Sequence, residues 1–359
     1  MRYKMADVVT EIKEKEDHPS ESKYERFVGL EHYVSGEIVI RNFGSTELLE
    51  SSMKVFRSGD ILVARRNVYL KRASVAMFDG LTSGDSIVLR AKNERVGRLL
   101  PFVLNTDAFW DFADQYSDGT MSKRLSPKTL MEYEFDLPDE SEQDELADIL
   151  WAAVDVKYSY QELLKQTDEL VKSQFIEMFG EPMSKELDTD LAELGIACTL
   201  KAGKFVKADD IKESMGEGLY PCFGGNGIRG YVPNFNQEGE HPLIGRQGAL
   251  CGNVQFASGQ FYATEHAVVV TPNRNDIDRL WLYYLLVQLK LERYATGAAQ
   301  PGIAVNKLER IRIDIPEIAL QRKFAEFAKQ SDKSKFEIKK SIENISELIK
   351  SLMQQDFTN

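Results

Sequence analysis

The sequence ELVKS at Glu169–Ser173 returns as ELIKS at Glu347–Ser351. The same offset in numbering relates other pairs: Tyr116–Gly119 and Tyr294–Gly297, Asp136-Leu137-Pro138 and Asp314-Ile315-Pro316, Gln143 and Gln321, and Phe179 and Phe357. From Tyr116 to Phe179 the register holds without a gap, which chance matches do not do over so long a stretch. The chain is therefore interpreted as two copies of one unit of about 180 residues.

A weaker match lies upstream, at a slightly larger offset. There Leu62–Arg65 parallels Leu243–Arg246, and Ser86–Val88 parallels Ala267–Val269. Because each copy is long enough to build its own core, the pattern indicates a duplicated domain and not a solenoid of short repeats.

Both copies close with a segment of helical periodicity that follows a proline, as is typical of helix starts. In the first copy the apolar positions after Pro138 are Leu146, Ile149, Ala153, Val156, Tyr160, Leu163, Leu170 and Phe175. In the second copy, after Pro316, they are Phe324, Phe327, Ile338, Ile342, Ile345, Leu348 and Leu352. We expect two helices of some 35 to 40 residues, each roughly 55 Å long.

Within the first helical segment, Ile149, Val156, Leu163 and Leu170 recur at every seventh position. A repeat of seven is typical of helices that pair along an apolar seam. We therefore expect the two long helices to pair with each other, which leaves their outer faces for partner proteins.

The remaining parts of each copy contain short β-rich runs separated by glycine-rich turns. These runs are Asp60–Ala64, Ser86–Leu89, Pro242–Gly245 and Ala267–Val270. The sequence thus predicts a mixed α/β (α+β) fold: two similar domains, each followed by a long helix, with an internal pseudo-twofold repeat. The expected boundaries are 1–138 for the first domain, 139–182 for the central helix, 183–316 for the second domain and 317–359 for the C-terminal helix.

The charge is unevenly distributed along the 359 residues. The net charge of −12 taken alone argues against a nucleic-acid-binding protein. However, Lys54–Arg98 contains ten basic and four acidic residues, whereas Glu132–Asp155 contains ten acidic and no basic ones. The sign of the charge must therefore be judged by region. Three cysteines without a C-x-x-C pair, no apolar run of membrane length and no signal sequence favour a reduced, cytoplasmic protein.

The search for catalytic motifs gives weak candidates. Asp139 and Asp155 superficially match the carboxylate spacing of a metal-dependent nuclease, but both lie in the acidic helical segment. Gly225-x-Gly227-x-x-Gly230 matches the dinucleotide fingerprint, yet Tyr231–Asn234 cannot begin the helix that the fingerprint requires. No histidine or cysteine has the spacing of a zinc ligand, so we predict neither a catalytic nor a metal site.

The run Arg65–Arg72 combines cations with an amide and an aromatic ring, a composition suited to phosphate anchoring and base recognition. Its counterpart in the second copy is Arg246-Gln247-Gly248, and arginine and glutamine side chains can bond guanine and adenine bidentately. The alternative is a solvated surface without a ligand. The candidate DNA-binding residues are Arg65, Arg66, Asn67, Lys71, Arg72, Lys123, Asn226, Arg229, Arg246 and Gln247.

Together these features resemble the specificity (S) subunits of type I restriction–modification systems. The similarity lies in the duplication and in several phrases: Phe27–Glu31 (FVGLE), Tyr220–Tyr231 (YPCFGGNGIRGY), Leu243–Gly248 (LIGRQG) and Asp314-Ile315-Pro316 with Gln321. The chain is short for this family, and its first domain lacks a counterpart of the Gly224–Gly230 phrase.

The resemblance implies a non-catalytic subunit whose two domains each recognise half of a bipartite DNA sequence. The two long helices would lie antiparallel, separate the two domains and dock two methyltransferase (M) subunits. The candidate partner-binding residues are Leu146, Ile149, Leu163, Leu170, Phe175, Phe324, Ile338, Ile345 and Leu348. No cofactor is expected in this chain, because S-adenosylmethionine would bind the methyltransferase, and ATP and Mg would bind restriction (R) subunits. The alternatives are a metal-dependent nuclease and a protein-interaction scaffold without DNA contact.

Overall fold

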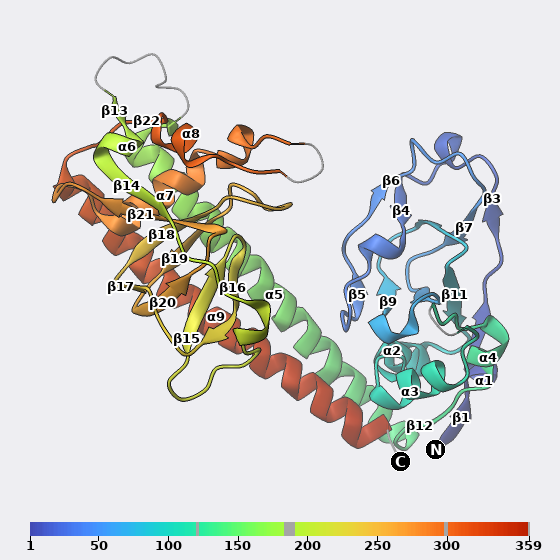
Figure 1. Ribbon diagram of the computed structural model, residues 1–359. Coiled ribbons are helices and arrows are strands. Elements are labelled where there is room, and N and C mark those ends of the chain that lie inside the picture. The colour runs from blue at the N-terminus through green and yellow to red at the C-terminus, as the bar shows by residue number, and fades with distance from the viewer. Residues whose placement is uncertain (120–121, 183–190, 298–300, 358–359) are drawn as a thin grey trace. The chain divides into compact units, whose positions relative to one another are not determined.

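The structure is a computed structural model that describes residues 1–119, 122–182, 191–297 and 301–357. It divides into two compact units: the first comprises Met1–Glu162 with Lys339–Asn359, and the second comprises Leu163–Ile338. Each unit contains a globular part and a section of both long helices, α5 (Glu140–Phe179) and α9 (Ile318–Phe357) (Figure 1). The segment 183–190, at the expected start of the second domain, lies outside the described residues.

The globular part of the first unit is built mainly from short strands. Its elements are β1 (Arg2–Lys4), α1 (Met5–Val8), β2 (Val9–Glu11), β3 (Lys15–Glu16), β4 (Arg26–Val28), β5 (Val39–Ile40), β6 (Gly44–Ser45), β7 (Met53–Phe56), β8 (Ile61–Ala64), β9 (Ala73–Ala76), β10 (Gly80–Thr82), β11 (Ser86–Ala91), α2 (Glu94–Val103), α3 (Asp107–Gln115), α4 (Pro127–Met131) and β12 (Glu134–Asp136). The strands form sheets of order β2-β11-β8-β9-β5 and β3-β7-β10-β4-β6, with β1 paired to β12.

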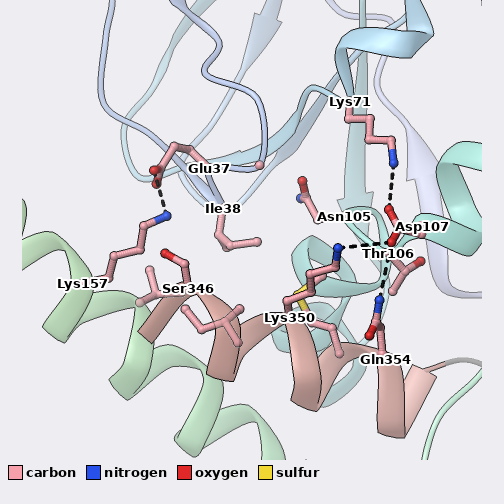
Figure 2. A pocket seen from close by; sticks show the side chains of 14 residues that line it. Glu37, Ile38, Lys71, Asn105, Thr106, Asp107, Lys157, Ser346, Lys350 and Gln354 are labelled. Carbon is pink, nitrogen blue, oxygen red and sulfur yellow. Dashed lines mark hydrogen bonds and ion pairs between the residues drawn. The ribbon is translucent and has the colours of Figure 1, made fainter. Parts of the chain in front are cut away.

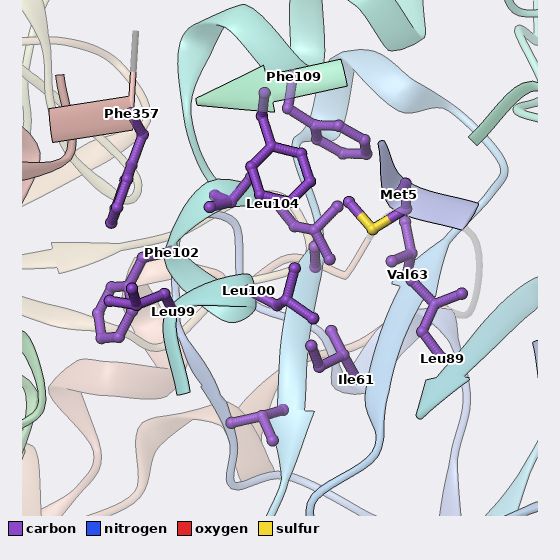
Figure 3. Close-up of a cluster of buried hydrophobic side chains, with 14 of the residues drawn as sticks. Met5, Ile61, Val63, Leu89, Leu99, Leu100, Phe102, Leu104, Phe109 and Phe357 are labelled. Carbon is purple, nitrogen blue, oxygen red and sulfur yellow. The ribbon is translucent and has the colours of Figure 1, made fainter. Parts of the chain in front are cut away.

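Burial explains why these segments take these conformations. All four residues of β8 are buried, as an apolar strand in the middle of a covered sheet requires. The helices that cover it begin at side-chain caps: Asn93 accepts from the backbone N–H of Val96, and Thr106 accepts from that of Phe109. Figure 3 shows residues of β8, β11, α2 and α3 meeting in one apolar core, which Phe357 of α9 joins.

The second unit contains the corresponding elements. They are β13 (Ala192–Glu193), α6 (Leu194–Ala197), β14 (Cys198–Ala202), β15 (Tyr220–Gly224), β16 (Gly227–Val232), β17 (Gln237–Glu238), β18 (His241–Gly245), β19 (Val254–Ala257), β20 (Gln260–Ala263), β21 (Ala267–Pro272), α7 (Arg279–Gln288), α8 (Val305–Glu309) and β22 (Arg312–Ile313). The sheets have the order β14-β21-β18-β19 and β16-β15-β20-β17, with β13 paired to β22.

The two units have the same topology. The order β14-β21-β18-β19 repeats β2-β11-β8-β9, and every neighbouring pair within these two four-strand orders is antiparallel. The first sheet has one further strand, β5, which is parallel to β9. The order β17-β20-β15-β16 repeats β7-β10-β4-β6, including the parallel pairing of β15 with β20 and of β4 with β10. The predicted mixed α/β fold with an internal repeat is confirmed.

Sections of α5 and α9 pack against each other in each unit. In the first unit Ile349 and Met353 of α9 share the core with Leu146 and Leu150 of α5. In the second unit the rings of Phe175 and Phe324 lie edge to face, with centroids 5.2 Å apart. In the second unit Lys335 also pairs with Asp168, seven residues before Phe175, so increasing residue numbers of α5 meet decreasing numbers of α9 and the two helices are antiparallel there.

The helix pairing does not use the seam expected from the repeat of seven. The side chains of Ile149, Val156, Leu163 and Leu170 remain 45–53% exposed. The buried positions of α5 are instead Gln143, Leu146, Ala147, Leu150, Val154, Val171 and Phe175. The expectation that this seam pairs the two helices is therefore wrong, because the packed face of α5 is a different one. Among the described residues, no helix is both long and apolar enough to cross a membrane.

Candidate functional site

A polar groove in the second unit brings together three of the candidate residues. Asn226 and Arg229 come from the β15–β16 hairpin, and Gln247 comes from the loop that follows β18. Five other residues line the groove: Gly225, Gly248, His266, Pro301 and Gly302. Its volume is about 560 Å³ and all three candidate side chains are exposed, so they are available to a ligand.

Backbone hydrogen bonds fix the loop of residues 246–248, which we call the Arg246 loop. The N–H of Arg246 donates to the carbonyl of His266 (3.0 Å), and its carbonyl accepts from the N–H of Ile303 (2.9 Å). The N–H of Gly248 donates to the carbonyl of Pro301 (3.0 Å). Gln247 thus projects from a loop that is tied on both sides.

The β15–β16 hairpin approaches this loop closely because two glycines allow it. A Cβ at position 245 would overlap the carbonyl oxygen of Gly225, and Gly227 has a φ of 97°. The exposed Asn226 accepts a hydrogen bond from the side chain of Asn253 (3.1 Å). The glycines therefore place the hairpin tip on the groove.

In the first unit, the loop of residues 65–67, which we call the Arg65 loop, lies beside Asp85, Ser122 and Arg124. Asp85 accepts a hydrogen bond from Arg124 (2.8 Å) and forms a longer ion pair with Arg66 (3.9 Å). Ser122 Oγ donates to Asn67 Oδ1 (2.9 Å). The structure thus brings Arg65, Arg66 and Asn67 together with partners that are distant in sequence.

The other basic candidates of the first unit are held by their own partners. Lys123 donates to Asp114 (2.5 Å). Arg72 donates to the carbonyl oxygens of Leu30 and Arg66, both at 3.0 Å, and partial burial lowers the pKa of this guanidinium. Because these contacts occupy their charged groups, Lys123 and Arg72 are less available to a ligand than Arg66.

Lys71 lies elsewhere, in a cavity of about 310 Å³ within the first unit (Figure 2). It forms an ion pair with Asp107 (2.7 Å), which Lys350 and Gln354 of α9 also contact. The bond from Lys71 holds the pKa of Asp107 below its usual value, although burial opposes the shift. Lys71 therefore braces α3 near α9, and the structure does not bring it to the Arg65 loop.

The candidate partner-binding residues divide by burial. Leu146, Phe175, Phe324 and Ile338 are at most 8% exposed. Their expected role is corrected: these side chains are covered by the chain itself and cannot form an accessible docking face. Ile149, Leu163, Leu170 and Leu348 are 45–53% exposed, and Ile345 is partly buried. These five stay predictions.

The helix geometry excludes Asp139 and Asp155 as a shared metal site. Asp139 directly precedes α5, whereas Asp155 lies well inside it. At the rise of an α-helix, they are separated by roughly 24 Å along the axis, too far to share one metal ion. In the described part of the chain, no group of three or more His, Cys, Asp or Glu residues could hold a metal.

Sequence reasoning missed two residues of these sites, Asp85 and His266. The backbone carbonyl of each accepts from the N–H of the loop arginine. They carry no local motif. Only the upstream offset, which pairs Ser86 with Ala267, relates position 85 to position 266.

Comparisons with known proteins agree with the fold. Residues 189–347 match the family model of the type I restriction modification DNA specificity domain. The chain is 50% identical over 139 residues to the EcoprrI type I restriction enzyme specificity subunit of Escherichia coli, and 30% identical over 107 residues to a putative one of Haemophilus influenzae. The matches cover 38% and 29% of this chain, but only 34% and 28% of those relatives.

Two solved structures share the fold over nearly the whole chain. The S subunit of a type I restriction–modification system from M. genitalium has a TM-score of 0.63 at 15% identity and covers 100% of this chain and 96% of its own. A structure described as showing complex assembly and conformational transition of the type I system has a TM-score of 0.52 at 18% identity, with coverages of 99% and 96%. The resemblance to type I specificity subunits is confirmed.

Proposed function

We propose that this chain is the recognition subunit of a type I restriction–modification complex, because residues 189–347 match the family model of the type I restriction modification DNA specificity domain. It has no catalytic role of its own. Its two globular parts recognise the two halves of a bipartite DNA sequence. A subunit with this role works in the cytoplasm, where the chromosome lies.

One observation carries the proposal: both units present a loop beginning with arginine at the same place in the same fold. Arg65 follows β8 and Arg246 follows β18, the strands at matching positions of the matching sheets. Two similar domains that carry different side chains suit a target of two different halves, and the distance between half-sites follows from protein geometry.

The exposed apolar residues of α5 and α9 support docking of methyltransferase subunits. Ile149, Leu163, Leu170 and Leu348 are large apolar side chains left uncovered by this chain. Three of them, Ile149, Leu163 and Leu170, are separated by multiples of seven residues on α5 and so lie on one face of it, and exposed apolar side chains that gather on one face mark interaction sites. The methyltransferase would supply S-adenosylmethionine chemistry, and restriction subunits, where present, would use ATP and Mg.

Mapping N6-methyladenine across the host genome, with and without this gene, tests the proposal. We expect deletion to remove methylation at one bipartite, asymmetric sequence. An unchanged map in cells that express the methyltransferase gene would contradict it. A control strain carrying the gene on a plasmid must restore the lost motif.

A further inference from the structure

The Arg65 and Arg246 loops share a backbone framework that extends well beyond the arginine. In the first unit the N–H of Arg65 donates to the backbone carbonyl of Asp85, and the carbonyl of Arg65 accepts from the N–H of Leu125, at 2.8–2.9 Å. The N–H of Asn67 donates to the backbone carbonyl of Lys123 at 2.9 Å. The second unit has the three equivalent backbone bonds, at 2.9–3.0 Å. Their N–H donors are those of Arg246, Ile303 and Gly248, and the carbonyl acceptors are, in the same order, those of His266, Arg246 and Pro301. Bridges between strands also match: Arg66 with Arg124, and Gln247 with Gly302. Side chains can therefore be compared position by position.

The loop arginines are the shared position. Nε of Arg65 and Nε of Arg246 are both buried, and neither donates to an acceptor among the described residues. Buried donors without a partner are rare in folded proteins and call for an explanation. Each of the two arginine residues is nevertheless partly exposed, so a ligand can approach the rest of the side chain. A phosphate oxygen is an acceptor that both units could use alike, because every nucleotide carries one whatever its base.

The neighbouring positions differ in chemistry. Arg66 corresponds to Gln247, Asp85 to His266, and Arg124 to Gly302. The first unit thus presents two guanidinium groups on either side of a carboxylate. The second presents the amide of Gln247 in a groove with Asn226 and Arg229. Arginine suits the acceptor pair of guanine, and glutamine or asparagine suits the donor and acceptor of adenine.

We propose that this one framework separates anchoring from base selection. Arg65 and Arg246 hold DNA phosphates in their respective half-sites. Arg66 with Arg124, oriented by Asp85, selects guanine in one half. Gln247, with Asn226 beside it, selects adenine in the other. The inference rests on the proposed function and assigns the side chains that make its two halves differ.

The two positions proposed to select bases are tested by one exchange between equivalent sites and one truncation. Complexes of the full chain with its methyltransferase are expressed in a host without N6-adenine methylation, and the methylated motif is mapped. R66Q gives the first unit the residue of the second, and Q247A removes the amide. We expect each variant to weaken the preference at one position of one half-site by about 5- to 150-fold, the range of a bidentate base contact, and to leave the other half unchanged.

The anchoring arginines are tested by binding to a duplex that contains the mapped motif and to one that lacks it. We expect R65A and R246A to weaken both alike, to lower the slope of log affinity against log salt by about 0.9, and to leave the motif unchanged. K123A is the matched control, because Lys123 is a neighbouring cation already bound to Asp114. Gel filtration with the methyltransferase verifies that each variant folds and assembles.

The outcomes separate the two proposals. If the wild-type complex methylates no bipartite motif, the proposed function fails. If it does, but R66Q and Q247A assemble and methylate an unaltered motif, the assignment of base selection is overturned. A motif changed by R65A or R246A would overturn their role as anchors, as would unchanged affinity and salt dependence.

Discussion

Gln143 and Gln321 occupy equivalent positions in the two copies, and both are fully buried. Each donates from its side-chain amide to the carbonyl of the proline five positions earlier, at 2.9 Å to Pro138 and 2.7 Å to Pro316. Each bond fixes the chain where a long helix leaves a globular part. The duplication thus extends to a single buried amide.

Gln321 has more partners than Gln143, so its loss should cost more. Its side chain also accepts from the N–H of Asp278 (2.8 Å) and donates to the carbonyl of Asp276 (2.9 Å). We expect Q321A to lower the free energy of unfolding by about 2–3 kcal/mol, because buried groups lose their partners, and Q143A by about 1 kcal/mol. Urea unfolding of both variants measures this, and an equal loss would contradict it.

Gly245 is expected to be essential for the geometry of the second unit's groove. A Cβ there would overlap the carbonyl of Gly225, so G245A should displace the β15–β16 hairpin and cost about 1–3 kcal/mol. The equivalent residue of the first unit is Ala64, which already carries a Cβ. A64G is the matched control. Hydrogen exchange of residues 220–232 should rise in G245A only, and unchanged protection would refute the prediction.

The elements with strong periodicity were predictable from sequence. The helices α5 and α9 each span 40 residues, and each begins shortly after the proline that marks its start, Pro138 or Pro316. The buried strand β8 was predictable because all its residues are apolar. What failed was the pairing face of α5, since a repeat of seven does not say which side the rest of the chain covers.

The first unit's counterpart of the Gly224–Gly230 phrase was hidden because only its backbone is equivalent. Phe27 and Val28 pair with β10 as Cys222 and Phe223 pair with β20. However, β4 and β6 are joined by residues 29–43, whereas a two-residue turn joins β15 and β16. Strand pairing depends on backbone groups, so the side chains could change freely. For the same reason, Asp85 and His266 could not be assigned before the fold was known.

The ion pair of Asp107 with Lys71 predicts a specific dependence on pH. The pKa of Asp107 in the folded chain lies below its ordinary value of 3.8. The ionised carboxylate therefore contributes to the free energy of unfolding above about pH 3.8. This contribution is lost as the pH falls through the lower pKa of the folded state. Because both side chains are nearly half exposed, D107N should cost less than about 1 kcal/mol at pH 6. Urea unfolding measures the difference in the free energy of unfolding between wild type and D107N. This difference should vanish in acid, and one that grows there would contradict the assignment.

Cys198 should be chemically inert in the folded protein. Burial raises the pKa of its thiol to about 12, from an ordinary value of 9.0, and burial also raises the pKa of Cys222 and Cys251. The thiolate is the reactive form, so a thiol reagent should modify none of the three at pH 8 until urea unfolds the chain. By linkage, stability should fall as the pH rises from 9 toward 12. Rapid modification of Cys198 in the native protein would disprove its burial.

The exposed leucines of α5 allow docking to be tested apart from folding. Leu163 and Leu170 are 45% and 53% exposed, so L163S and L170S should change the free energy of unfolding by less than about 0.5 kcal/mol. If they contact the methyltransferase, the double variant should bind it at least tenfold more weakly in titrations. F175S is the matched control on the same helix, because Phe175 is fully buried. Its loss should lower the free energy of unfolding of the second unit by about 3–5 kcal/mol. Undiminished methyltransferase binding by a folded L163S/L170S variant would remove these two residues from the docking face.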